Sequence, residues 1–186
     1  MLTLTLTFLV KTLIDLYMMV LLLCIWMQLA HSDFYNPFTQ FIVTITDPVI
    51  GPLRRIMPTL GTLDSASLLL GCMLAIIKFP LLIMIEMRCL ILEPIYLLVG
   101  LLALLKTAGE LVFWVLIIRS LLSWITQGHS PIDVVLYQLS EPLMYPIRRV
   151  LPAIGGIDFS AMVLILILYT LNYLGMDLFP GIWYRL

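Results

Sequence analysis

Residues 47–64 read DPVIGPLRRIMPTLGTLD, and residues 141–158 read EPLMYPIRRVLPAIGGID. The two stretches align without a gap at a shift of 94, and seven of their eighteen positions are identical, including two adjacent arginines between prolines. The similarity continues upstream, where WMQLAHS at 26–32 matches WITQGHS at 124–130. Self-similarity at a fixed distance indicates an internal duplication, so each half of the chain should form the same structural unit.

The composition indicates that these units lie in a membrane. The chain has 186 residues, of which 62% are hydrophobic and 11% charged, and its mean hydropathy is +1.12. Soluble domains are usually about half apolar. The formal net charge of −1 provides no basic surface, so no nucleic acid is expected as a partner. The N-terminal region lacks a basic segment and a small-residue cleavage site, and we expect it to be an uncleaved first span.

Each unit is predicted to begin with a transmembrane helix, at roughly residues 8–30 and 107–128, because about 20 helical residues cross the hydrocarbon. A short helix should follow each span, at residues 37–46 and 131–140, since Asn36-Pro37 and Ser130-Pro131 are typical of helix N-termini. We expect both short helices to lie along the membrane surface, because their apolar residues recur on one face. These residues are Phe38, Phe41, Ile42 and Ile45 in the first copy and Ile132, Val135, Leu136 and Leu139 in the second.

The surface helices are predicted to end at Asp47-Pro48 and Glu141-Pro142, because a residue before proline avoids the helical conformation. The paired arginines would then lie in a turn stiffened by proline, after which a second transmembrane helix begins, at roughly 65–87 and 159–178. An aspartate would cap each of these helices. The residues predicted to hold the turn are Pro52, Pro58 and Asp64 in the first copy and Pro146, Pro152 and Asp158 in the second.

The predicted fold is therefore an all-α membrane protein with four transmembrane helices. They form two duplicated helix–surface helix–Arg-Arg turn–helix units, at residues 1–92 and 93–186. Residues 93–125 leave the number of spans open, because about 33 helical residues exceed one upright span. We expect residues 94–105 to form an interfacial or tilted lead that bends near Gly109, and a fifth crossing is the alternative. Four spans would give parallel copies, whereas five would invert the second.

Together, the arginine pairs between prolines, the glycine and aspartate after them, the Trp-to-His-Ser segment and the duplicated unit resemble the YggT family of bacterial integral membrane proteins. The resemblance covers essentially the whole chain and implies a multi-pass protein of the bacterial inner (cytoplasmic) membrane. It also implies links to osmotic tolerance and potassium uptake, to cell-division gene neighbourhoods, and to cytochrome assembly in plastid relatives. It carries no catalytic residue over to this chain.

The paired arginines have three interpretations. They could anchor the turn in the headgroup phosphates, a contribution of about 1 kcal/mol for each cation near an anionic surface. They could be held ready to grip a lipid phosphate, or a carboxylate of a partner membrane protein, through the planar guanidinium fork. They could also pair with the acidic residues at the two ends of each stretch and lock the turn. The four residues are Arg54, Arg55, Arg148 and Arg149.

Two opposite charges within the spans, Asp15 and Lys78, are predicted to form an intramembrane pair. Asp15 lies 16 residues before His31, at the end of the first span, and Lys78 lies 14 residues after Asp64, at the start of the second. At about 1.5 Å per residue the two depths differ by only about 3 Å. Charges near mid-bilayer usually face protein and find partners. The pair is interpreted as a structural clasp, with one step of an ion or proton path as the alternative.

His31 and His129 occupy matching positions and could together bind a metal ion or haem iron, or respond to pH. No other ligand pattern accompanies them, so we expect helix-end histidines and no metal or cofactor. The three cysteines are widely spaced in or beside apolar segments and are interpreted as apolar fillers: Cys24, Cys72 and Cys89.

The leading functional hypothesis from the sequence is a non-enzymatic scaffold or assembly and stress-adaptation factor. It would engage membrane lipids or an unidentified membrane protein, with another copy of the chain in a homo-oligomer as a further candidate partner. The alternative is a transport-related protein that supports osmotic or potassium homeostasis. An enzyme is not expected, because the sequence contains neither a nucleophile–base arrangement nor a metal-binding motif.

Overall fold

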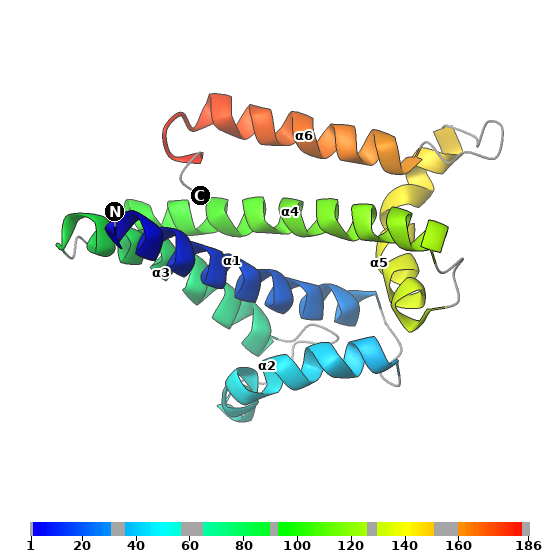
Figure 1. Ribbon diagram of the computed structural model, residues 1–186, viewed down its shortest axis with the longest axis horizontal. Coiled ribbons are helices and arrows are strands. Elements are labelled where there is room, and N and C mark those ends of the chain that lie inside the picture. The colour runs from blue at the N-terminus through cyan, green and yellow to red at the C-terminus, as the bar shows by residue number, and fades with distance from the viewer. Residues whose placement is uncertain are drawn as a thin grey trace.

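A computed structural model describes residues 2–30, 36–56, 65–89, 93–125, 130–150 and 160–183. In these ranges the chain forms six helices and no strand (Figure 1). Four of the helices, α1, α3, α4 and α6, are long and apolar enough to cross a membrane, which confirms the predicted all-α fold with four spans. The helices are α1 (Leu2–Leu29), α2 (Pro37–Ile56), α3 (Ser65–Met87), α4 (Ile95–Ile125), α5 (Pro131–Val150) and α6 (Ser160–Leu178).

Helix α4 differs from the expectation for residues 94–105. It is one helix of 31 residues, about 46 Å long at 1.5 Å per residue, so neither a separate lead nor a fifth crossing occurs in the described part of the chain. No proline lies between residues 95 and 125, and a lone glycine such as Gly109 costs a helix only about 1 kcal/mol. A helix of this length fits a bilayer by tilting or by extending beyond the hydrocarbon.

The two helices that were predicted to lie at the membrane surface continue through prolines at which they were predicted to end. Helices α2 and α5 are each 20 residues long and contain Pro48, Pro52, Pro142 and Pro146. The predicted bounds of 37–46 and 131–140 are therefore too short, and the paired arginines lie in the last turn of a helix instead of in a turn. The two prolines of each helix are four residues apart on its exposed side. There the lost backbone bonds can be tolerated by bending the helix rather than ending it.

The predicted helix N-termini are confirmed. The backbone N–H of Phe38 donates to Asn36 Oδ1 at 2.9 Å, and the N–H of Ser130 donates to Asp133 Oδ2 at 3.2 Å, as in a capping box. Asn36 Nδ2 also donates to the backbone carbonyl of Pro131 at 2.9 Å. The caps of α2 and α5 are therefore joined to each other as well as to their own helices.

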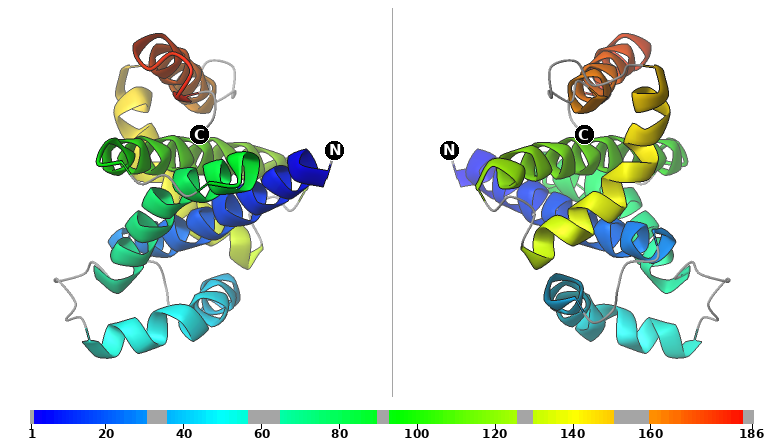
Figure 2. Two further views of the ribbon diagram at one scale, coloured as in Figure 1. Left: turned by 90° about the vertical axis from the view of Figure 1, so that its left-hand side faces the viewer. Right: turned by 90° about the vertical axis from the view of Figure 1, so that its right-hand side faces the viewer.

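The spans pack unevenly. Helices α1, α3 and α4 contact one another closely, and α5 crosses the end of this group beside α1 and α4 (Figure 2). Helix α2 lies outside it, against α1, α3 and α5. Helix α6 contacts α4 and α5, but only 6% of its spanning segment is buried, against 28% to 33% for the other three spans. The fourth span therefore leaves space beside α4.

The two copies of the duplicated sequence do not occupy equivalent environments. Val135 and Leu139 of α5 are fully buried, in a cluster with residues of α1 and α2. Their counterparts 94 positions earlier, Phe41 and Ile45 of α2, are 60% and 39% exposed. The same sequence position is therefore core in the second surface helix and outer surface in the first.

Candidate functional site

The structure brings Asp15 and Lys78 together. Lys78 Nζ donates to Asp15 Oδ1 at 2.5 Å, and both residues lie near the middle of their helices, α1 and α3. The Lys78 side chain is 2% exposed and that of Asp15 is 21% exposed, so the cation is the more deeply enclosed partner. Pairing at this depth reduces the cost of placing either charge in the bilayer.

Three further charges gather around this pair. Lys11 precedes Asp15 by one turn on α1, and Lys106 precedes Glu110 by one turn on α4. Lys106 and Glu110 interact electrostatically with each other and with the other three residues, and the formal charges of the five sum to +1, from three lysines and two carboxylates. The sequence analysis assigned no role to Lys106 or Glu110. Both residues lie near the middle of one long apolar segment. This position could have indicated from the sequence that they lie at the same membrane depth as Asp15 and Lys78.

A cavity of about 760 Å³ lies between α4 and α6, beside this charge cluster. Lys106 Nζ donates to the backbone carbonyl of Trp183 at 2.9 Å, and Trp183 Nε1 donates to Asn172 Oδ1 at 2.9 Å, so hydrogen bonds connect both walls. Asn172 is the counterpart of Lys78 in the second copy. The cavity is lined by Leu105, Lys106, Gly109, Glu110, Phe113, Trp114, Leu168, Tyr169, Leu171, Asn172, Met176 and Trp183.

In the second copy, one of the candidate binding arginines, Arg148, forms an ion pair within the protein. Arg148 Nη1 donates to both carboxylate oxygens of Glu141, at 2.7 and 2.9 Å. Arg119 of α4, which the sequence interpretation did not single out, approaches the same carboxylate at 3.7 Å and donates to Ser140 Oγ at 2.6 Å. Glu141 was predicted to lie at the end of a helix, but it lies inside α5 and connects this helix to α4. An ion pair as open to solvent as Arg148–Glu141 contributes at most about 1 kcal/mol.

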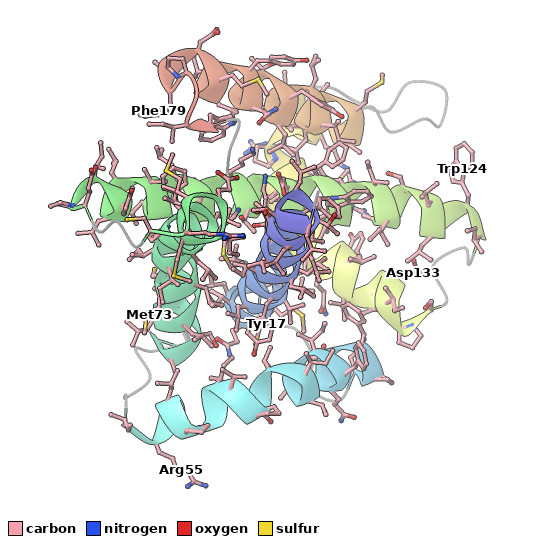
Figure 3. The ribbon with its side chains drawn as sticks, turned by 60° about the vertical axis from the view of Figure 1, so that its left-hand side comes forward. Tyr17, Arg55, Met73, Trp124, Asp133 and Phe179 are labelled. Carbon is pink, nitrogen blue, oxygen red and sulfur yellow. The ribbon has the colours of Figure 1, made fainter. Side chains whose placement is uncertain are left out.

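The other arginines point outward where their side chains are described. Arg55 extends from the end of α2 away from the bundle (Figure 3), and Arg149 is exposed with its guanidinium carbon 5.9 Å from the ring centroid of Tyr145. The side chain of Arg54 lies outside the described part of the structure. The same holds for four of the six residues predicted to hold the turn, Pro58, Asp64, Pro152 and Asp158, whereas Pro52 and Pro146 lie inside helices.

Helix α2 has three distinct faces. One face packs on the protein through Ile42, Thr46, Ile50 and Leu53. A second face is polar and includes Gln40, Thr44, Asp47 and Arg55. The third is apolar and exposed, with Phe41, Ile45, Pro48, Val49, Pro52 and Ile56. A helix with this arrangement is typical of the membrane interface, where the apolar face enters the acyl boundary and the polar face meets water.

The predicted metal-binding alternative has no support in the described residues. His31 and His129 both lie outside them, and within the described ranges no group of three or more His, Cys, Asp or Glu side chains could hold a metal ion. Cys24 is buried in the cluster shared by α1, α2 and α5, as expected of an apolar filler.

Comparisons with known proteins agree with the duplicated architecture. The CCB3/YggT family model matches residues 3–85 and 98–179. The chain is 54% identical over 190 aligned residues to "Uncharacterized protein YggT" of Escherichia coli (strain K12), which covers 98% of this chain and 99% of that protein. It is 51% identical over 183 residues to "Uncharacterized protein in proC 3'region" of Vibrio alginolyticus, with the same coverage.

A relative from Haemophilus influenzae is 43% identical over 178 residues, covering 94% of this chain and 93% of the relative. The names of these relatives assign no activity to them. No solved structure matches the chain.

Proposed function

Because this chain belongs to the CCB3/YggT family, we propose that it is a non-enzymatic scaffold or assembly and stress-adaptation factor of the bacterial inner membrane. It engages anionic lipid headgroups or a partner membrane protein through α2 and the arginine-bearing ends of α2 and α5. The observation that carries this proposal is the three-faced character of α2, whose exposed apolar row lies beside the outward-pointing Arg55.

Two of the arginines support this role because their side chains are exposed. Arg55 and Arg149 are exposed at helix ends, whereas Arg148 is held by Glu141. A planar guanidinium can make two parallel hydrogen bonds to a phosphate or a carboxylate, which a lysine cannot. The bond between Asn36 and Pro131 joins the start of α2 to the start of α5, so the two arginine-bearing helices are connected at their N-termini.

Replacing the four arginines at 54, 55, 148 and 149 by lysine tests the proposal. The quadruple variant keeps all four charges but loses the fork, so we expect it to fold normally and to fail to restore growth of a deletion strain under osmotic stress. The amount of anionic lipid that co-purifies with the variant should fall by about tenfold or more, as measured by native mass spectrometry. A tenfold change corresponds to about 1.4 kcal/mol, so each of the four lost guanidinium forks needs to contribute only a fraction of that energy.

Arg88→Lys is the matched control, because Arg88 is exposed beyond the end of α3 and outside both arginine pairs. It should behave as wild type in both measurements. Full complementation and unchanged lipid retention by the folded quadruple variant would show that the arginines act only as a charge anchor.

Transport of an ion or a small solute is the second candidate function. It is favoured by one specific observation, which is the cluster of five charges beside the cavity between α4 and α6. Purified protein in liposomes distinguishes the two functions. Selective flux that Glu110→Gln abolishes would support transport, whereas co-purifying subunits together with an absence of flux would support the scaffold.

A further inference from the structure

The cavity between α4 and α6 contains charges that hydrocarbon alone could not solvate. Lys106 and Glu110 both line it, near the middle of α4, and Glu110 is exposed to it. A charged side chain at mid-bilayer costs at least about 2.5 kcal/mol unless it faces protein, water or a polar ligand. An acyl chain could cover the apolar part of the wall, but it would give the Glu110 carboxylate no polar contact and would leave the Lys106 ammonium only its bond to the Trp183 carbonyl. The occupant of the cavity must therefore carry polar or charged groups.

The polar groups of the wall have both signs. Lys106 and Glu110 are one helical turn apart on the same face, and the Asn172 amide lies on the opposite wall with its oxygen bonded to Trp183. A ligand with a single charge would be attracted by one of the two ionic groups and repelled by the other. Complementarity to both requires a cation and an anion a few ångströms apart in the ligand.

Aromatic rings surround the carboxylate side of the cavity. Phe113 makes an edge contact with Trp114 at 5.8 Å between ring centroids, and another with Tyr169 of α6 at 5.5 Å. All three rings belong to the lining. The faces of such rings attract organic ammonium groups, above all alkylated ones that cannot donate hydrogen bonds. Glu110 and these three rings therefore form a suitable binding site for an alkylammonium group, while Lys106 can bind a carboxylate.

We propose that the cavity between α4 and α6 is a binding site for a small zwitterion. The ammonium of the ligand lies against Glu110 and the aromatic rings, and its carboxylate lies against Lys106. The volume of about 760 Å³ falls in the range of ligand pockets, which is roughly 300 to 1,000 Å³. The formal charges of the surrounding cluster, to which Lys11, Asp15 and Lys78 contribute, sum to +1, and this surplus adds to the attraction between Lys106 and the carboxylate of the ligand.

Three probes of nearly the same size and shape test the two-charge requirement. Trimethylglycine carries both charges, choline replaces its carboxylate by a hydroxymethyl group, and 3,3-dimethylbutanoate replaces its ammonium nitrogen by carbon. Titration of the purified protein in detergent is followed by calorimetry and by tryptophan fluorescence, because Trp114 and Trp183 line the cavity. Trimethylglycine should bind at least about tenfold more tightly than either single-charge probe.

Variants connect the binding to this cavity. Glu110→Gln and Lys106→Gln should each weaken trimethylglycine binding by at least about tenfold. Glu86→Gln, the same chemical change on an exposed residue near the end of α3, should have no effect. Gly109→Leu is a variant that keeps every charge but should block the cavity. A Cβ at Gly109 meets no heavy atom within 4 Å, so the leucine side chain has room to enter the cavity.

Trimethylglycine binding that Gly109→Leu and Glu110→Gln both remove would establish the site. Absence of trimethylglycine binding to the wild-type protein, or equal affinity for all three probes, would overturn the inference. Binding that survives in the folded Gly109→Leu variant would place the ligand elsewhere and would overturn it too. The inference does not rest on the proposed scaffold role, since the arginine variants leave this cavity intact and the cavity variants leave the arginines intact.

Discussion

Replacing Asp15 by asparagine should destabilise the protein by about 3 kcal/mol, since the buried Lys78 ammonium loses the carboxylate with which it forms an ion pair. The remaining Lys78 side chain is only 2% exposed, and its ammonium donates to Asp15 Oδ1 at 2.5 Å. Replacing Lys78 by methionine should cost less. The Asp15 carboxylate is 21% exposed, and Lys11 lies one turn away on the same helix. The difference in free energy of unfolding between the two variants therefore shows which of the two charges is stabilised more by the other.

The double variant Asp15→Asn, Lys78→Met should recover part of the loss, because an amide and a thioether leave no unpaired charge in the bilayer. Unfolding in mixed micelles measures each of the four free energies of the cycle. A coupling energy above about 0.5 kcal/mol is expected for residues in contact. Glu86→Gln, which removes a carboxylate exposed near the end of α3, should leave the stability unchanged. Losses that simply add in the double variant would contradict the clasp.

The parts of the fold that depend on local sequence were predictable. Helix α3 begins and ends where the apolar segment does, and the caps at Asn36 and Ser130 follow from side chains two or three residues from the groups they bond. The end of α2 was not predictable in this way. The rule for a residue before proline is a local preference, and the packing of Ile50, which follows Pro48, and of Leu53, which follows Pro52, outweighs it.

The charge cluster was only partly predictable. Counting residues from one membrane face placed Asp15 and Lys78 at one depth, because both lie in spans whose ends were recognised. No such count was made for Lys106 and Glu110, since the start of α4 was assigned to a separate lead. The rotation of α4 about its axis, which turns Glu110 toward α6, is set by packing between helices and not by the sequence of α4, whose apolar residues surround it on all sides.

The difference in environment between the two copies could also be recognised only from the structure. Phe41 and Val135 occupy the same position of the duplicated sequence and are both apolar, so the sequence predicted that each would face the membrane from a surface helix. Only the position of α5 against α1 and α4, which leaves α2 outside, makes one exposed and the other core. A duplicated sequence therefore predicts the elements of each copy, but not which copy supplies the outer surface.

Alanine at Gly100 should destabilise the protein by about 2 kcal/mol, within the range for overpacking. A Cβ there would lie 2.7 Å from Ile76 Cγ1 and 2.8 Å from Ile76 Cα, so the backbone of α3 would have to move away from α4. Small residues at such crossings let membrane helices approach closely. Gly109→Ala is the matched control on the same helix, because its Cβ meets nothing within 4 Å. It should be neutral or stabilising by up to about 1 kcal/mol through helix propensity.

The two glycine variants also test how the α3–α4 contact and the charge pair depend on each other. Lys78 follows Ile76 by two residues on α3, so a displacement of α3 at Gly100 should also move the ammonium away from Asp15. Gly100→Ala combined with Asp15→Asn should then cost less than the sum of the two single changes, whereas Gly109→Ala combined with Asp15→Asn should be additive within about 0.5 kcal/mol. Unfolding in mixed micelles gives both comparisons. Equal stability of Gly100→Ala and Gly109→Ala would mean that α3 and α4 do not cross at Gly100 in the membrane.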